Sequence, residues 1–158
     1  MLFSVDENVL VVANGRETHA SLACQLVCVD FLLECKRDKS LLLDAVGAVL
    51  ALYASKCNWS GQPGTGDEFF RWAFDNMHGL EVVDLARDGS GRYIDVPDGL
   101  DDFDRDDHIW VALVLKASSQ AQIVNAVDSD YLERATELNA ARVDVVELCP
   151  DDVRQGRT

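Results

Sequence analysis

Short apolar segments alternate with segments of helical periodicity along almost the whole chain, and this alternation restricts the fold more than any other feature. The short segments have the length and composition of buried strands, whereas apolar residues three or four positions apart indicate helices. Strands that alternate with helices are typical of a parallel sheet covered on both faces. The sequence therefore predicts an α/β fold of three layers, in which helices flank a mostly parallel central sheet.

The individual elements follow from the same patterns. Strands are expected over residues 2–5, 41–44, 81–85, 123–127 and 143–148. A short helix is expected after the first strand, and further helices over 18–36, 48–56, 109–115 and 131–141. Leu22, Leu26 and Leu33 recur at helical spacing in the first long helix. Another helix should open at Thr65, because Glu68 stands three residues later as in a capping box. The polar stretch 88–102 predicts a long loop.

The length of 158 residues is that of one domain with a single core. We therefore expect one domain over residues 1–150, followed by a polar C-terminal tail over 151–158 that is frayed.

The N-terminus and the cysteines bear on the compartment. No basic segment precedes an apolar stretch at the start, and the longest apolar stretch, 45–54, is far shorter than a membrane span. The five cysteines are an odd number without a tight framework spacing, which suits reduced thiols. The expectation is a soluble, cytoplasmic protein with no membrane segment.

The formal net charge of −14 constrains the partners. Nucleic-acid affinity comes largely from lysine and arginine, so this charge argues against a broad basic face that follows phosphates. An acidic excess is also compatible with a cation site, with a basic partner or with solubility alone. The charge by itself leaves these alternatives open.

Acidic residues follow two of the predicted strands. Asp6 comes directly after the first strand, and Asp128 follows 123–127, with Asp130 close behind. Asp107 stands where the helix over 109–115 begins. Ligands of an open α/β sheet bind outside the carboxyl ends of the strands, and clustered carboxylates repel one another unless a cation neutralises them. The pattern predicts a Mg²⁺ or Mn²⁺ site that activates water and stabilises a phosphoryl centre.

A simpler interpretation stands beside the metal site. Asp6, Asp107 and Asp128 could each cap a helix, which aspartate commonly does after a strand. Asn8 either orients Asp6 or caps the following turn.

Three acidic motifs resemble, in their order, those of PIN domains, the metal-dependent ribonucleases of many bacterial toxin–antitoxin pairs. The motifs are Asp6-x-Asn8, Asp104-x-x-Asp107 before 109–112, and the run 126–130 that holds Asp128 and Asp130. The segment 61–67, which precedes an aromatic helix, also resembles a prokaryotic branch of PIN-like proteins. The resemblance covers nearly the whole chain. It implies that Asp6, Asp107, Asp128 and Asp130 hold metal or position water, with RNA as substrate and an antitoxin-like protein as partner.

One position departs from the family pattern. Leu52 stands where PIN-like proteins usually carry a glutamate on the helix after the second strand. The pocket then binds metal less tightly, borrows an acid such as Asp44, or has lost catalysis. The two hypotheses are a metal-dependent ribonuclease, in which Asn8, Asp44 and Asp104 support the four ligands, and an impaired PIN-like module that acts through protein contacts. A homo-oligomer is compatible with both.

Overall fold

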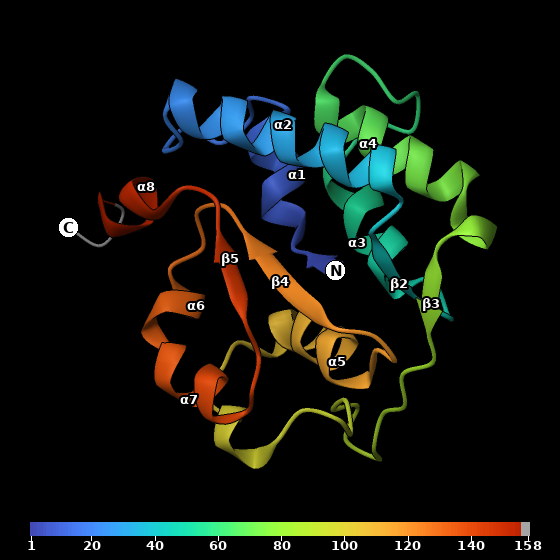
Figure 1. Ribbon diagram of the computed structural model, residues 1–158, viewed down its shortest axis with the longest axis vertical. Helices are drawn as coiled ribbons and strands as arrows, with labels where there is room; N and C mark the ends of the chain where they lie inside the picture. The colour runs from blue at the N-terminus through green and yellow to red at the C-terminus, as the bar shows by residue number, and fades with distance from the viewer. Residues whose placement is uncertain (156–158) are drawn as a thin grey trace.

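The computed structural model describes residues 1–155 and shows strands and helices in alternation (Figure 1). In chain order the elements are β1 Leu2–Val5, α1 Glu7–Ala13, α2 Leu22–Asp38, β2 Leu42–Asp44, α3 Ala48–Lys56, α4 Thr65–Asp75, β3 Glu81–Val83, α5 His108–Lys116, β4 Ala121–Asn125, α6 Asp130–Glu133, α7 Ala135–Ala140, β5 Val145–Glu147 and α8 Pro150–Gln155. Short 3₁₀ turns occupy Met77–Gly79, Asp98–Leu100 and Arg105–Asp107.

All strand pairs between the named strands are parallel. β1, β4 and β5 form a three-stranded sheet with β4 in the middle, and β2 pairs with β3. A parallel bridge between Phe3 and Leu41, with a 2.8 Å bond from the Phe3 N–H to the Ser40 carbonyl, joins the two sheets. The strands therefore run in the order β3-β2-β1-β4-β5. The strand order reverses between β1 and β4, which is where open α/β sheets bind their ligands.

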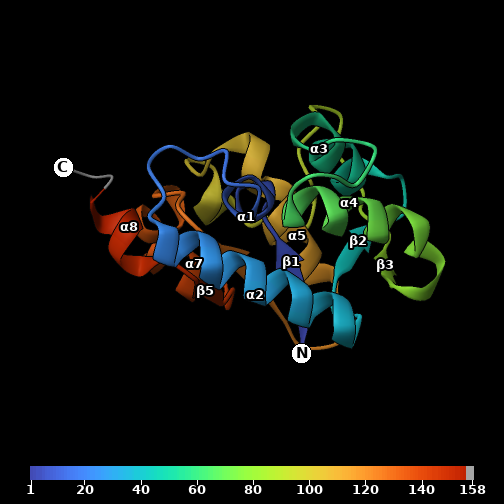
Figure 2. The same cartoon turned by 90° about the horizontal axis from the view of Figure 1, so that it is seen from above.

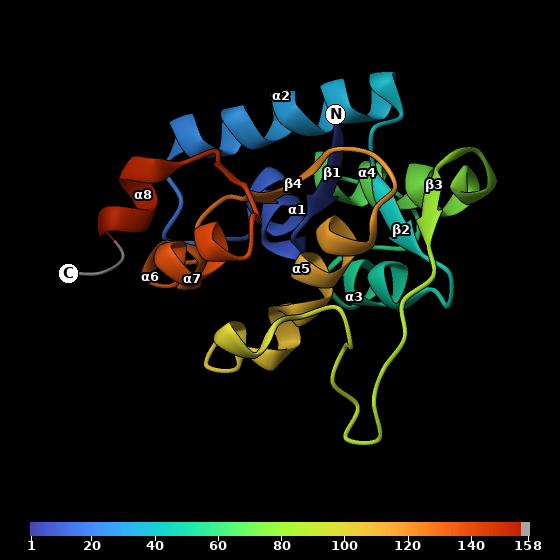
Figure 3. The ribbon, with the colours of Figure 1, turned by 60° about the horizontal axis from the view of Figure 1, so that its bottom comes forward.

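Helices cover both faces of these strands, as the sequence predicted. Neighbouring side chains of β1 point in opposite directions: Phe3 packs edge-on against Phe31 of α2 at 5.2 Å, whereas the Ser4 hydroxyl donates to the Trp110 carbonyl of α5. In Figure 3, α2 lies on one side of the strands, and α5, α6 and α7 lie on the other. The fold is thus a three-layer α/β arrangement with a parallel centre.

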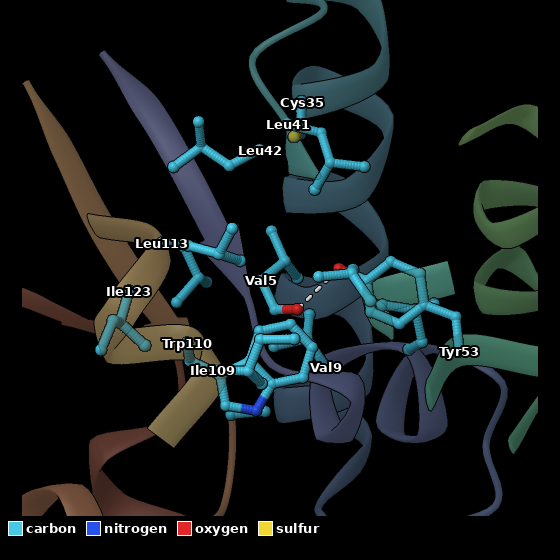
Figure 4. Close-up of a cluster of buried hydrophobic side chains, with 14 of the residues drawn as sticks. Val5, Val9, Cys35, Leu41, Leu42, Tyr53, Ile109, Trp110, Leu113 and Ile123 are labelled. Atoms are coloured by element: carbon cyan, nitrogen blue, oxygen red, sulfur yellow. Dashed lines mark hydrogen bonds between the residues drawn. The ribbon is translucent and has the colours of Figure 1, made fainter. Parts of the chain in front are cut away.

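The core reaches the point where β1 ends. Tyr53 of α3 and Trp110 of α5 are fully buried and stack at 6.1 Å (Figure 4). The Tyr53 hydroxyl donates a 2.6 Å hydrogen bond to the carbonyl of Val5, the last residue of β1. Buried rings therefore fix the backbone immediately before Asp6.

Several element boundaries differ from the prediction. The helix expected over 131–141 is divided at Arg134 into α6 and α7. The helix expected at Thr65 has Gly64 as its N-cap, and Asp67 rather than Glu68 accepts the cap N–H. In α2, the apolar residues that indicated a helix are exposed, and the inward face consists of smaller residues and one leucine: Cys24, Cys28, Leu32 and Cys35.

The C-terminal segment is ordered where a frayed tail was expected. Residues 150–155 form α8, Val153 is buried, and the Asp152 carboxylate accepts from the Ser21 N–H at 2.6 Å. Residues 156–158 lie outside the described part of the chain. α8 thereby lies against the first turn of α2 (Figures 1 and 2).

The prediction that all five cysteines are reduced is wrong for one pair. Cys24 of α2 and Cys149, just before α8, form a disulfide, and the Cys28 sulfur lies 4.0 Å from that of Cys149. Cys28, Cys35 and Cys57 are free thiols. The bonded cysteines are 125 residues apart, so only the folded chain brings them together.

Among residues 1–155, no helix is both long enough and apolar enough to span a membrane.

Candidate metal centre

Asp6 is fixed by the end of β1 and the start of α1. Its Oδ1 accepts from the Asn8 N–H at 3.0 Å, and its Oδ2 accepts from the Tyr131 hydroxyl at 2.6 Å. The side chain is 2% exposed. Asp6 therefore caps α1 and is at the same time held as a buried carboxylate at the carboxyl end of β1.

Asn8 ties α1 to the segment after β4. Its amide Nδ2 donates to Asn125 Oδ1 at 3.0 Å, while its Oδ1 accepts from the Ala126 and Val127 N–H groups at 3.0 and 3.1 Å. The Asn8 side chain therefore neither orients Asp6 nor caps the following turn. It holds the backbone that leads to Asp128.

Asn125 completes the same network from the last position of β4. Its Nδ2 donates to the Asp128 carbonyl and to Glu147 at the end of β5, both at 2.8 Å. The Asp128 N–H donates back to Asn125 Oδ1 at 3.2 Å, and Asp128 Oδ1 accepts from the Asp130 N–H at 2.9 Å. The side-chain amides of Asn8 and Asn125 thus hold the turn that presents Asp128 and Asp130.

Asp107 lies far from Asp6 in sequence, in the segment that leads into α5. It ends the 3₁₀ turn Arg105–Asp107 and precedes α5, and its side chain makes no capping bond to that helix although it is only 8% exposed. The capping interpretation therefore lacks support at Asp107, and the Asp107 carboxylate is available for other contacts.

The aspartates predicted as ligands come together. Carboxylate oxygens of Asp6, Asp107 and Asp128 lie within 4.8 Å of one another, and so do those of Asp104, Asp107 and Asp130. The two groups share Asp107. We call these five residues the aspartate cluster.

Burial and mutual repulsion disturb the titration of the cluster. Burial raises the pKa of Asp6 to about 7, with a further increase from the Glu7 carboxylate. Burial, followed by the charges of Asp6 and Asp128, raises the pKa of Asp107 to about 9. The pKa of Asp130 is raised by burial and by Asp128. Among the described residues, no lysine or arginine forms an ion pair with these carboxylates that would offset the effect of burial.

Glu7 is an acidic neighbour that sequence reasoning missed. Its Oε2 is buried without a hydrogen-bond partner among the described residues, and burial raises its pKa. Its position directly after Asp6 was the available signal, but an acid in the first turn of a helix is ordinarily explained by the helix dipole.

Tyr131, Asn125 and Glu147 were also missed. The first holds Asp6, and the other two hold the Asp128 turn. Asn125 carried a signal, because an amide at the end of an apolar strand needs polar partners when it is buried.

Two of the residues discussed for the departure from the family pattern lie apart from the cluster. Asp44 caps α3, accepting from the Ala48 and Val49 N–H groups at 2.9 and 2.8 Å, and it lines a different cavity. Leu52 lines a cavity together with Glu7. The structure does not bring Asp44 into the cluster as a replacement acid.

The donor set fits a hard divalent cation. Every candidate ligand is a carboxylate oxygen, which is the donor that Mg²⁺ and Mn²⁺ prefer, and burial together with the neighbouring carboxylates raises the pKa values of Asp6 and Asp107, which a bound cation would lower. The cluster lies at the carboxyl ends of the strands, where the strand order reverses.

Comparison of the chain with protein-family models, with curated proteins and with solved structures finds no match.

Proposed function

We propose that this chain is a Mg²⁺- or Mn²⁺-dependent ribonuclease of the PIN-like type. The observation that carries the proposal is the convergence of Asp6, Asp104, Asp107, Asp128 and Asp130 in two groups that share Asp107. A carboxylate shared by two groups suits a site for two divalent cations, which together would neutralise charge on both sides of a phosphodiester.

The roles of the residues follow from their contacts. Asp6, Asp107 and Asp128 would hold a cation, with Asp104 and Asp130 beside them. A bound Mg²⁺ or Mn²⁺ would supply an activated water and charge stabilisation at the phosphoryl group. Tyr131 positions Asp6 through its hydroxyl, and Asn8 positions the turn before Asp128.

Cleavage of a mixed pool of single-stranded RNA in millimolar Mn²⁺ tests the proposal. The wild type should cleave, EDTA should stop cleavage, and Asp6→Asn should lower the rate by a factor of 100 or more, about 3 kcal/mol of transition-state stabilisation. Asp30→Asn, on the exposed face of α2, is the matched control and should cleave like wild type. Cleavage that survives EDTA or Asp6→Asn would contradict the proposal.

A second candidate is a PIN-like module that has lost catalysis and acts through protein contacts. Leu52 in the cavity beside Glu7 and the net charge of −14 favour it. Leu52→Glu separates the candidates in the same assay: an impaired module should remain inactive or gain cleavage only in this variant, whereas an active enzyme cleaves without it.

The cellular setting is part of the same proposal. We propose a cytoplasmic protein with a protein partner of the antitoxin kind. The Cys24–Cys149 disulfide opposes this placement, because disulfides are rare in the cytosol. Non-reducing electrophoresis of protein alkylated in the cell separates a bonded pair from free thiols.

A further inference from the structure

Next to the aspartate cluster lies a cavity of about 840 Å³. Its walls come from α3, from the loop after β3 and from the segment that leads into α5. Glu7 and His108 also line it, and they directly follow Asp6 and Asp107 in the chain. In Figure 3 the loop after β3 projects from the body of the molecule beside α3 and α5. The volume is in the range of cavities that bind ligands, roughly 300–1,000 Å³.

The charge of this cavity is opposite to that of the chain. Four basic side chains line it, namely Lys56, Arg87, Arg92 and Arg105, against two acidic ones, Glu7 and Asp106. The whole chain has 14 lysines and arginines against 28 acids. We call this feature the cationic cavity. Four of the chain's 14 lysines and arginines thus line one concave surface beside the aspartate cluster.

Within residues 1–155, three of the four basic side chains form no ion pair. Arg92 is paired with Asp101 at 2.8 Å, but no carboxylate lies within ion-pair distance of the Lys56, Arg87 or Arg105 side chains among the described residues. An arginine carries five N–H donors, and the contacts of Arg87 and Arg105 use only some of them. These side chains therefore retain donors and charge for an anionic ligand.

Arg87 and Arg105, the two arginines of the cavity without an ion pair among the described residues, are held in place by hydrogen bonds. The Arg87 guanidinium donates to the Tyr93 hydroxyl at 2.6 Å and lies over the Tyr93 ring at 4.5 Å. Arg105 donates to the Ser90 carbonyl at 3.2 Å, and the Ser90 N–H and hydroxyl are in turn bound by Asp88. The loop thus presents its charges with less loss of side-chain freedom on binding than a free arginine would suffer.

We propose that the cationic cavity binds the phosphates of single-stranded RNA next to the bond that is cut. This inference rests on the proposed function, because it takes the aspartate cluster as the cleavage site. The cavity is large enough for more than one phosphate, it adjoins the cluster through Glu7, and Tyr93 adds an aromatic ring to its wall. The negative charge elsewhere would repel the strand, so the bound path is confined to this surface.

The test measures binding separately from cleavage. A fluorescent single-stranded RNA is titrated in EDTA with the Asp6→Asn variant, and anisotropy is recorded between about 50 and 300 mM KCl. The same titration is made with Arg87→Ala/Arg105→Ala added, and with Arg37→Ala/Arg71→Ala added as the control. The control removes the same charge from arginines that do not line the cavity.

We expect the cavity variant to bind at least about tenfold more weakly than the control. Its plot of log affinity against log salt should be shallower by about 1.4, because each lost phosphate contact removes about 0.7 from the slope on single strands. Equal affinities for the two double variants, or no binding at the lowest salt, would overturn the inference.

The outcomes also separate this inference from the proposed function. Metal-dependent cleavage by wild type, with no difference between the double variants, would leave the nuclease intact and reject the cavity as its RNA site. A cavity-dependent loss of binding, with no metal-dependent cleavage, would support the cavity and reject the nuclease.

Discussion

Asp67→Ala is expected to lower the free energy of unfolding by about 3 kcal/mol or more, because several donors lose a buried acceptor at once. The Asp67 carboxylate is fully buried and accepts from the Asn58 and Gly64 N–H groups at 2.8 and 3.0 Å, from the Asn14 amide at 3.1 Å and from the Arg16 guanidinium at 3.0 Å. It joins the end of α1 to the loop before α4. Urea unfolding monitored by circular dichroism measures the loss.

The neighbouring Glu68→Ala is the matched control. Glu68 pairs with Lys36 at 2.6 Å, but its side chain is 55% exposed, so the change should cost less than about 1 kcal/mol. Similar losses for the two variants would show that the Asp67 network does not hold this part of the fold.

Stability in EDTA is expected to fall as the pH rises from about 5 to about 9, by on the order of a few kcal/mol. The pKa of Asp6 is raised to about 7 and that of Asp107 to about 9, against an ordinary value of 3.8. Between those values the folded protein binds more protons than the unfolded chain, so raising the pH favours unfolding. Millimolar Mg²⁺ should reduce the fall, because a cation then replaces the protons.

Urea unfolding at several pH values, with EDTA or Mg²⁺, measures this dependence. Asp107→Asn should give a shallower fall in EDTA and a smaller effect of Mg²⁺, whereas Asp84→Asn, an exposed residue outside the cluster, should behave like wild type. A stability that rises with pH in EDTA, or one on which Mg²⁺ has no effect, is the contrary result.

The alternation of strands and helices was enough to predict the layers, because hydrophobic periodicity is local. The end of β4 was predicted two residues too late for a reason that is not local. Ala126 and Val127 are apolar like the strand before them, but their N–H groups bond to Asn8, 118 and 119 positions away, instead of to a strand.

The glycines of 61–67 show the same limit. The sequence predicted that this segment leads into a capped helix at Thr65, but it gave no reason for the individual glycines. The structure gives close packing as the reason for two of them: a Cβ on Gly64 would lie 2.0 Å from Asn14 Oδ1, and one on Gly66 would lie 2.2 Å from the Leu10 carbonyl oxygen. Neither neighbour is close in sequence.

The aspartates of the cluster could be predicted because each stands beside an element end that parallel topology brings to one edge. Glu7 and Tyr131 could not be, because their roles depend on which side chains meet across α1 and α6. The disulfide was hidden for the same reason, since Cys24 and Cys149 meet only when α8 lies against α2.

Calorimetric titration with Mn²⁺ at neutral pH tests the central claim, that the aspartate cluster is a divalent-metal centre, most directly. Wild type should bind with a saturable heat, Asp6→Asn/Asp128→Asn should lose that heat, and Asp30→Asn/Asp144→Asn, which removes the same charge from exposed positions, should keep it. Equal binding by wild type and Asp6→Asn/Asp128→Asn, or no saturable heat with wild type, would contradict the claim.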